Sequence, residues 1–202
     1  MEFNPDELQQ KDIYKLLTGL IIPRPIAWVS TVNESGIYNL APFSYFNAVG
    51  DDPPHLMFSV SRSGHFNKDT LNNILQNKEF VVNMVTEELA EKMNSTAHPL
   101  QSHESEFEFA DVKSSPSTKV KPPLVAESPV SMECVLVHHY NLEQHKNGGS
   151  TIIIGRVVQF HIQDSILLDN FHINLDNYKP ISRLAGANYA KLGELFTIKR
   201  PQ

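Results

Sequence analysis

Two long segments in the second half of the chain alternate apolar and polar residues, and this pattern constrains the fold more than any other. One face of the first segment carries Met132, Cys134, Leu136, His138 and Tyr140, and one face of the second carries Ile152, Ile154, Arg156, Val158, Phe160 and Ile162. Alternate residues of a β-strand point to the same side of a sheet, so both segments are predicted to be strands. Residues 146–149, Lys-Asn-Gly-Gly, are typical of a hairpin turn. The pair therefore predicts a long antiparallel hairpin.

Shorter strands are predicted where β-branched and aromatic residues gather between turn residues. They are expected at 26–32, from Ile37 after a turn at Asn33–Gly36, at 55–61, at 79–85 and at 195–198. Before the first of these, Pro23 and Pro25 exclude helix and require extended chain.

Helical segments are few and short. Apolar spacing predicts a helix over 11–20, a second after a cap at Asn67 or Asp69, and a third capped by Thr86. Because these helices do not alternate regularly with the strands, a parallel doubly wound sheet is not expected. The sequence predicts a mainly β fold with short helices, arranged as an antiparallel barrel.

Length and composition predict one domain over residues 1–202. Residues 97–129 are rich in Pro, Ser and Lys and lack a clear period, which predicts a long surface excursion rather than a domain boundary.

Charge and cysteine content argue against several classes of partner. The net charge of -6, from 17 basic and 23 acidic residues, argues against a nucleic-acid partner. No apolar run is long enough for a membrane helix, and the N-terminal residues do not have the pattern of a secretory leader. A single cysteine, Cys134, suits a reducing compartment, so a cytoplasmic location is expected.

Several catalytic motifs are absent from the sequence. It contains no glycine-rich dinucleotide or P-loop motif and no nucleophile elbow. His138 and His139 are adjacent on a predicted strand and would point to opposite faces, so no metal site is expected. Cys134 lies on an apolar strand face, where a buried hydrophobic role is favoured over a catalytic thiol.

Three segments gather small polar residues, an amide and a cation near predicted strands. They are Pro23 to Thr31, Asn39 to Asn47, and Phe58 to Ser61 followed by Lys68-Asp69-Thr70. Hydroxyls, backbone amides and one cation together suit a flat ligand with a polar edge and a phosphate tail. Taken alone, Lys68-Asp69-Thr70 also fits a plain helix start.

The order of these segments resembles the flavin-reductase-like branch of the FMN-binding split-barrel family. The matching pieces are R-P-x-A-W-V-S-T from Arg24, N-L-A-P-F-S-x-F-N from Asn39, the segment from Pro53 to Val60, and K-D-T from Lys68. Val125 to Cys134 and Ile153 to Val158 continue the likeness, which spans residues 15–194. It implies an antiparallel split β-barrel.

The resemblance also implies a flavin site at a homodimer interface, with FMN favoured over FAD. The residues expected to bind the cofactor are Trp28, Val29, Ser30, Thr31, Asn39, Ala41, Pro42, Phe43, Ser44, Asn47, Ser59, Ser61, Lys68, Thr70, Arg183 and Tyr189. Backbone amides near Ala41 and Ser44 would face the flavin ring, and Lys68 and Thr70 would hold the phosphate. His55 or His65 could contact a nicotinamide.

The activity implied is hydride transfer from NADH or NADPH to flavin, in which the cofactor carries the chemistry and no catalytic side chain is required. Reduced flavin would feed a partner oxygenase or stay bound. The alternatives are an FMN-binding electron carrier, a flavin-dependent reductase or oxidase of a small organic substrate, and an interaction module without cofactor. The sequence does not distinguish NADH from NADPH.

Overall fold

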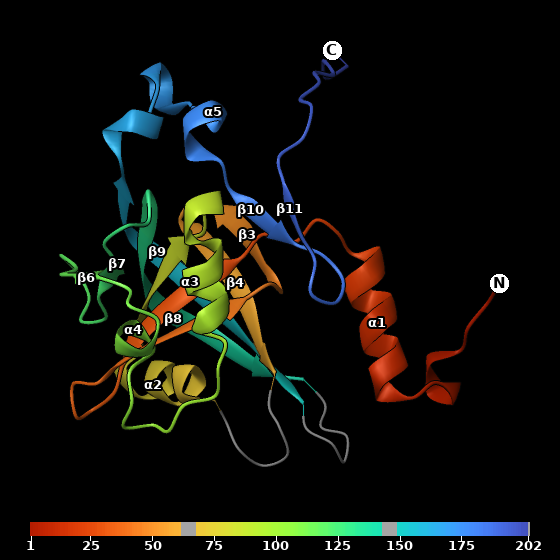
Figure 1. Cartoon of the computed structure of the whole chain (residues 1–202), viewed down its shortest axis with the longest axis horizontal. Helices are drawn as coiled ribbons and strands as arrows, with labels where there is room; N and C mark the ends of the chain where they lie inside the picture. Colours follow the sequence, from red (N-terminus) through yellow and green to blue (C-terminus); the bar gives the residue numbers. More distant parts are fainter. Residues whose placement is uncertain (62–67, 143–148, 202) are drawn as a thin grey trace.

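The computed structural model describes residues 1–61, 68–142 and 149–201. Within them, seven antiparallel strands form one sheet in the order β2-β1-β5-β8-β9-β4-β3 (Figure 1). The strands are β1 Ala27–Val32, β2 Tyr38–Phe43, β3 Phe46–Asp51, β4 Pro54–Ser61, β5 Glu79–Met84, β8 Val130–Asn141 and β9 Ser150–Ile162. This architecture confirms the mainly β, antiparallel prediction. Of the predicted hairpin turn at 146–149, only Gly149 lies within the described residues.

The strands at the two edges of the sheet, β2 and β3, are consecutive in the chain. Only Ser44 and Tyr45 separate them, so the sheet must curl for its edges to meet. The Ser59 amide of β4 donates to the Tyr45 carbonyl (2.9 Å) beside this link. β3 was not predicted from the sequence, because its residues are mostly exposed and its register is irregular between Ala48 and Gly50.

The interior of the curled sheet holds a core of aromatic and aliphatic side chains. Phe58 lies between Phe43 and Phe80, with ring centroids 5.0 and 5.5 Å apart. Cys134 is fully buried in this cluster, as predicted, and burial raises the pKa of its thiol.

The buried face of β9 is opposite to the face that carries Ile152, Ile154 and Arg156. Residues Thr151, Ile153, Gly155 and Val157 are buried, whereas Arg156 is exposed. A Cβ on Gly155 would lie 2.3 Å from the ring of Phe80, so the inward face needs a glycine there. Both faces of this strand carry apolar residues, and alternation alone therefore did not identify the inner one.

Short helices flank the sheet at the predicted places. They are α1 Gln10–Leu20, α2 Asp69–Asn77, η2 Glu87–Leu89 and α3 Ala90–Ser95. The predicted cap at Asp69 is wrong, because Lys68 is the N-cap residue of α2, and the alternative, Asn67, lies outside the described residues. Thr86 is the N-cap residue before η2 but makes no side-chain capping bond.

Residues 97–129 cover one side of the sheet and contribute to a second core. They form α4 Glu106–Phe109, β6 Ser114–Ser115 and β7 Leu124–Val125. Phe107, Val112 and Val125 pack in a cluster with Trp28. The Trp28 indole donates to the Thr96 hydroxyl (2.9 Å). The segment is therefore a packed part of the domain as well as a surface excursion.

The chain after β9 forms η3 Asp164–Ile166, η4 Asp169–Phe171, α5 Leu175–Tyr178 and the ribbon β10 Ile181–Arg183 with β11 Tyr189–Lys191. Beyond β11 the tail extends away from the body (Figure 1). The strand predicted at 195–198 is wrong: these residues form no strand, and Phe196 is exposed. In the described part of the chain, no helix has the length and apolar character needed to cross a membrane.

A fully buried carboxylate, Glu133 on β8, fixes the loop between β6 and β7. It accepts hydrogen bonds from the amides of Thr118 (2.8 Å), Lys119 (2.6 Å) and Val120 (3.0 Å), and from the His161 ring. Burial raises the pKa of Glu133, but these hydrogen bonds outweigh it and lower the pKa to about 2.

A lowered carboxylate pKa predicts a contribution to stability that is complete above pH 4.5 and is lost as the pH falls towards 2. Glu133→Gln should therefore lower the free energy of unfolding by about 1–3 kcal/mol at pH 6. The difference from wild type should shrink at pH 3. Urea unfolding at both pH values measures it, with the exposed Glu88→Gln as control. A difference that is equal at both pH values would contradict this account.

Candidate functional site

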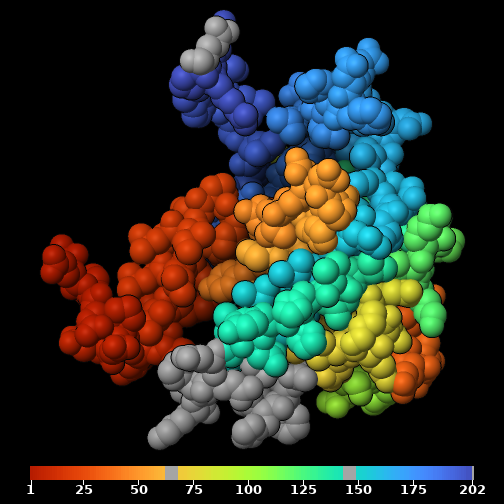
Figure 2. Space-filling view, turned by 180° about the vertical axis from the view of Figure 1, so that it is seen from behind, coloured from red at the N-terminus to blue at the C-terminus, as the bar shows by residue number. Residues whose placement is uncertain are grey.

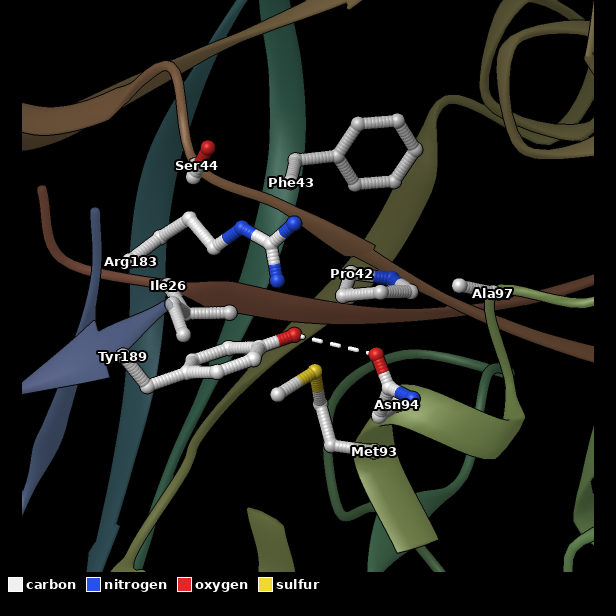
Figure 3. Close-up of a pocket in the computed structure, with 9 residues that line it drawn as sticks. All are labelled: Ile26, Pro42, Phe43, Ser44, Met93, Asn94, Ala97, Arg183 and Tyr189. Atoms are coloured by element: carbon white, nitrogen blue, oxygen red, sulfur yellow. Dashed lines mark hydrogen bonds between the residues drawn. The ribbon is translucent and has the colours of Figure 1, made fainter. Parts of the chain in front are cut away.

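Two adjoining cavities lie along the outer edge of β2 and share Pro42 and Ala97. The first encloses about 200 Å³ and is lined by Ile26, Pro42, Phe43, Ser44, Met93, Asn94, Ala97, Arg183 and Tyr189 (Figure 3). The second encloses about 260 Å³ and is lined by Asn39, Ala41, Pro42, Lys68, Asp69, Thr70, Thr96, Ala97, His98, Pro99, Leu100 and Glu106. Nine of the sequence-predicted site residues line one or both.

The first cavity has apolar walls and one cation. The guanidinium of Arg183 lies 4.4 Å from the centroid of the Tyr189 ring, and the Tyr189 hydroxyl donates to Asn94 Oδ1 (3.1 Å). Figure 3 shows both side chains reaching from the β10-β11 ribbon towards Pro42 and Asn94. A flat apolar group with a polar or anionic edge fits these walls.

The second cavity lies at the N-terminus of α2. The amides of Leu71 and Asn72 donate to the Lys68 carbonyl, so those of Asp69 and Thr70 have no partner inside the helix. Lys68 is exposed, and its Nζ lies 5.5 Å from the Phe43 ring centroid. Two helix-terminal amides and an ammonium group are suited to binding a phosphate.

A buried polar network joins this cavity to residues 97–129. The Glu106 carboxylate accepts from Asn39 Nδ2 (3.0 and 2.9 Å) and from the Leu40 amide (2.9 Å). Asn39 Oδ1 in turn accepts from Thr70 Oγ1 (2.7 Å) and Thr31 Oγ1 (3.3 Å). Burial raises the pKa of Glu106, and these hydrogen bonds partly offset that effect. Because the Thr70 hydroxyl proton is committed to Asn39, its backbone amide is the donor left for a ligand.

The four predicted residues of β1 lie in the core and line neither cavity. Trp28, Val29, Ser30 and Thr31 are all fully buried. The Ser30 hydroxyl donates to the Pro123 carbonyl, and the Trp28 indole donates to Thr96. These side chains support β2 from behind and are not placed to touch a ligand in the cavities.

The remaining predicted residues are separated from the two cavities. Asn47 and Ser59, together with Ser44, line a groove of about 440 Å³ between α1 and the strands β3 and β4. Ser61 lies exposed at the end of β4. Of the two histidines considered for nicotinamide, His55 lies on β4 away from the cavities, and His65 lies outside the described residues.

The outer edge of β2 has a sparse set of backbone donors. The amide of Leu40 points away from β1 to Glu106, so by strand alternation the amide of Ala41 points towards β1. Pro42 has no N–H. The Ala41 amide therefore does not point towards the cavities, and the structure does not support its predicted role in binding a ligand.

Sequence reasoning missed Met93, Asn94, Ala97 and Glu106. Met93 and Asn94 lie on α3, which the sequence predicted only as a short helix after Thr86. Glu106 lies 67 residues from Asn39 in a segment without a clear period. The single sequence signal was a carboxylate in the Glu-Phe-Glu-Phe run at 106–109.

Removal of the Glu106 carboxylate is expected to leave the Leu40 amide and Asn39 Nδ2 buried without acceptors. Glu106→Ala should lower the free energy of unfolding by about 1–3 kcal/mol. The exposed Glu108→Ala on the same helix should leave it within about 0.5 kcal/mol of wild type. Urea denaturation of the two variants tests this, and equal stabilities would overturn the network as a stabilising element.

Comparison with known proteins agrees with the geometry of the fold. The family model described as "Flavin reductase like domain" matches residues 19–179. The structure of nitrilotriacetate monooxygenase component B from Bacillus cereus is 43% identical, covers 98% of both chains and superposes with a TM-score of 0.94.

Two further solved structures are similar over nearly the whole chain. The 2-nitrobenzoate 2-nitroreductase of Pseudomonas fluorescens is 31% identical, with 100% of this chain and 96% of that chain covered and a TM-score of 0.87. A protein with a split barrel domain from Shewanella frigidimarina is 21% identical over the whole of both chains, with a TM-score of 0.85, and supports the fold alone. The chain belongs to the flavin-reductase-like family of split-barrel proteins.

Proposed function

We propose that the two adjoining cavities bind FMN and that the protein transfers hydride from NADH or NADPH to this flavin. The observation that carries the proposal is the arrangement of the cavities: an apolar one beside Arg183 and Tyr189 continues, past Pro42 and Ala97, into one with phosphate-binding character. Membership of a flavin-related family of oxidoreductases supports it.

The residues present fit the parts of FMN. The ring system is flat and largely apolar with a polar edge, which suits the walls formed by Ile26, Phe43 and Met93. A terminal phosphate suits Lys68 and the free amides of α2. Relative to FMN, FAD would add an adenosine monophosphate, for which the second cavity offers a single lysine, so FMN is preferred.

When bound, the flavin would supply the electron-accepting chemistry of hydride transfer. The protein contributes orientation and electrostatics. Arg183 places a positive charge in the first cavity, and the hydroxyl of Ser44 lines the same cavity, so both can stabilise an adjacent anion. Apolar side chains exclude water from the reacting face.

The fate of the electrons distinguishes the two principal alternatives. The Bacillus cereus relative is a component of a monooxygenase, which supports release of reduced flavin to a partner oxygenase. The Pseudomonas fluorescens relative is a nitroreductase, which supports the alternative in which bound flavin reduces a small organic substrate directly. Consumption of NADH or NADPH that increases with added free flavin supports the first alternative over the second and over an electron carrier.

We further propose a homodimer formed through the apolar side of α1. Tyr14, Leu17, Leu20 and Ile21 are exposed, and Leu17 and Ile21 line the groove against β3 and β4. Figure 2 shows α1 standing beside these strands at the side of the molecule. Sedimentation of a species at twice the 22.8 kDa chain mass is expected, and a monomer at micromolar concentration would contradict the proposal.

The phosphate contact can be tested by comparing FMN with riboflavin, which lacks the phosphate. Lys68→Met is expected to raise the Kd for FMN about tenfold, through loss of one charge-assisted contact, and to leave the Kd for riboflavin unchanged. Lys113→Met, at an exposed position away from the cavities, is the matched control. Fluorescence titration measures the Kd values of wild type and both variants for the two ligands. Equal losses for FMN and riboflavin would place the phosphate elsewhere.

The activity is tested by the absorbance spectrum of the FMN-loaded protein without oxygen. Addition of NADH or NADPH should bleach the flavin bands, and the nucleotide that acts faster is the physiological donor. A flavin spectrum that neither nucleotide bleaches would favour an electron carrier over a reductase. A protein that binds no flavin would overturn the proposed function.

A further inference from the structure

Arg24 is a buried cation at the junction of three parts of the fold. It is 5% exposed, and its guanidinium donates to the carbonyl oxygens of Thr18 (2.7 Å) and Ile21 (2.7 Å) at the end of α1, and of Leu184 (3.0 Å) after β10. Its Nε donates to the hydroxyl oxygen of Ser44 (3.4 Å). Four of its five N–H groups therefore have acceptors, and all four acceptors are neutral.

This positive charge has no carboxylate partner within the described residues, whose ion pairs all involve other side chains. Buried charges in proteins are usually paired, because desolvation of a lone ion is costly. The carbonyls at the C-terminal end of α1 supply partial negative charge and hold the guanidinium in place, but they do not cancel its charge. The field of Arg24 therefore extends to its surroundings.

Arg24 itself lines the groove between α1, β3 and β4, and its hydrogen-bond partner Ser44 lines both that groove and the first cavity, so the field reaches the first cavity through Ser44. The backbones of Arg24 and Arg183 also pair with each other through two hydrogen bonds (3.1 and 2.8 Å). A serine hydroxyl has one proton and two lone pairs. Because the Ser44 oxygen accepts from Arg24, its proton remains available to donate into the cavity.

We propose that Arg24 is a positioning residue that favours the reduced over the oxidised flavin, acting through its charge and through the Ser44 hydroxyl that it orients. This inference rests on the proposed function, in which the first cavity holds the flavin ring. Arg24 does not line the first cavity, so the inference concerns the preference between redox states and not a direct contact with the flavin.

The direction of the effect follows from charge balance. Hydride transfer delivers two electrons and one proton to N5, and the nicotinamide ring becomes a cation. In the flavin-loaded protein this transfer would therefore place one additional negative charge in the first cavity. A buried positive charge and an oriented hydroxyl stabilise that charge and leave the neutral oxidised ring little changed.

The test is the ratio of the Kd values for oxidised and reduced FMN, obtained from the midpoint potential of the bound flavin. Arg24→Met keeps the aliphatic stem and removes the charge, and it should lower the preference for reduced FMN at least tenfold, which for a two-electron couple is about 30 mV. Arg24→Lys keeps the charge and should recover most of the loss. Ser44→Ala should lose part of the preference for reduced FMN.

Arg156→Met, which removes an exposed arginine on β9, is the matched control and should leave the potential unchanged. Folding of each variant is checked by its thermal transition. If Arg24→Met does not fold, the midpoint potentials of Arg24→Lys and Ser44→Ala test the inference. If Arg24→Met and Ser44→Ala both fold and have the wild-type midpoint potential, this inference is overturned while the proposed function stands. Failure of wild-type protein to bind flavin would overturn the proposed function with it.

Discussion

The two-residue link between β2 and β3 is the constraint on which the rest of the structure depends. These strands form opposite edges of one sheet, yet only Ser44 and Tyr45 separate them. The sheet can satisfy this connection only by curling, which creates the aromatic interior and brings α1 and the β10-β11 ribbon to the same corner. The link also gives Ser44 its position between the first cavity and the groove beside α1.

Most of the strands that the sequence predicted correctly have a clear apolar period, whereas β2 was expected from Ile37 as the hairpin partner of β1. β1, β4, β5, β8 and β9 all contain β-branched and aromatic runs. β3 was missed because an edge strand with exposed polar residues and a register irregularity has no such period. The inner face of β9 was ambiguous because both faces are apolar, and only the close contact of Gly155 with the Phe80 ring identifies it.

Part of the candidate site was predicted from the sequence. There is a physical reason why some of its residues were predicted and others were not. Pro42, Phe43, Lys68, Arg183 and Tyr189 lie on edges or loops and reach the cavities. The residues of β1 belong to the same motif but lie one strand further in, where neighbouring elements use their polar groups. A linear motif does not reveal which strand is outermost. Contacts such as Glu106 with Asn39 join distant segments, and local patterns carry no information about them.

The edge of β2 has a consequence for association between molecules. An exposed strand edge usually offers a row of free N–H groups that can recruit a strand from another chain and begin aggregation. Here the Leu40 amide is occupied by Glu106, and the next outward position is Pro42, which has no N–H. The same two features that leave the cavities beside β2 open to a small ligand therefore prevent this edge from being extended by a further strand.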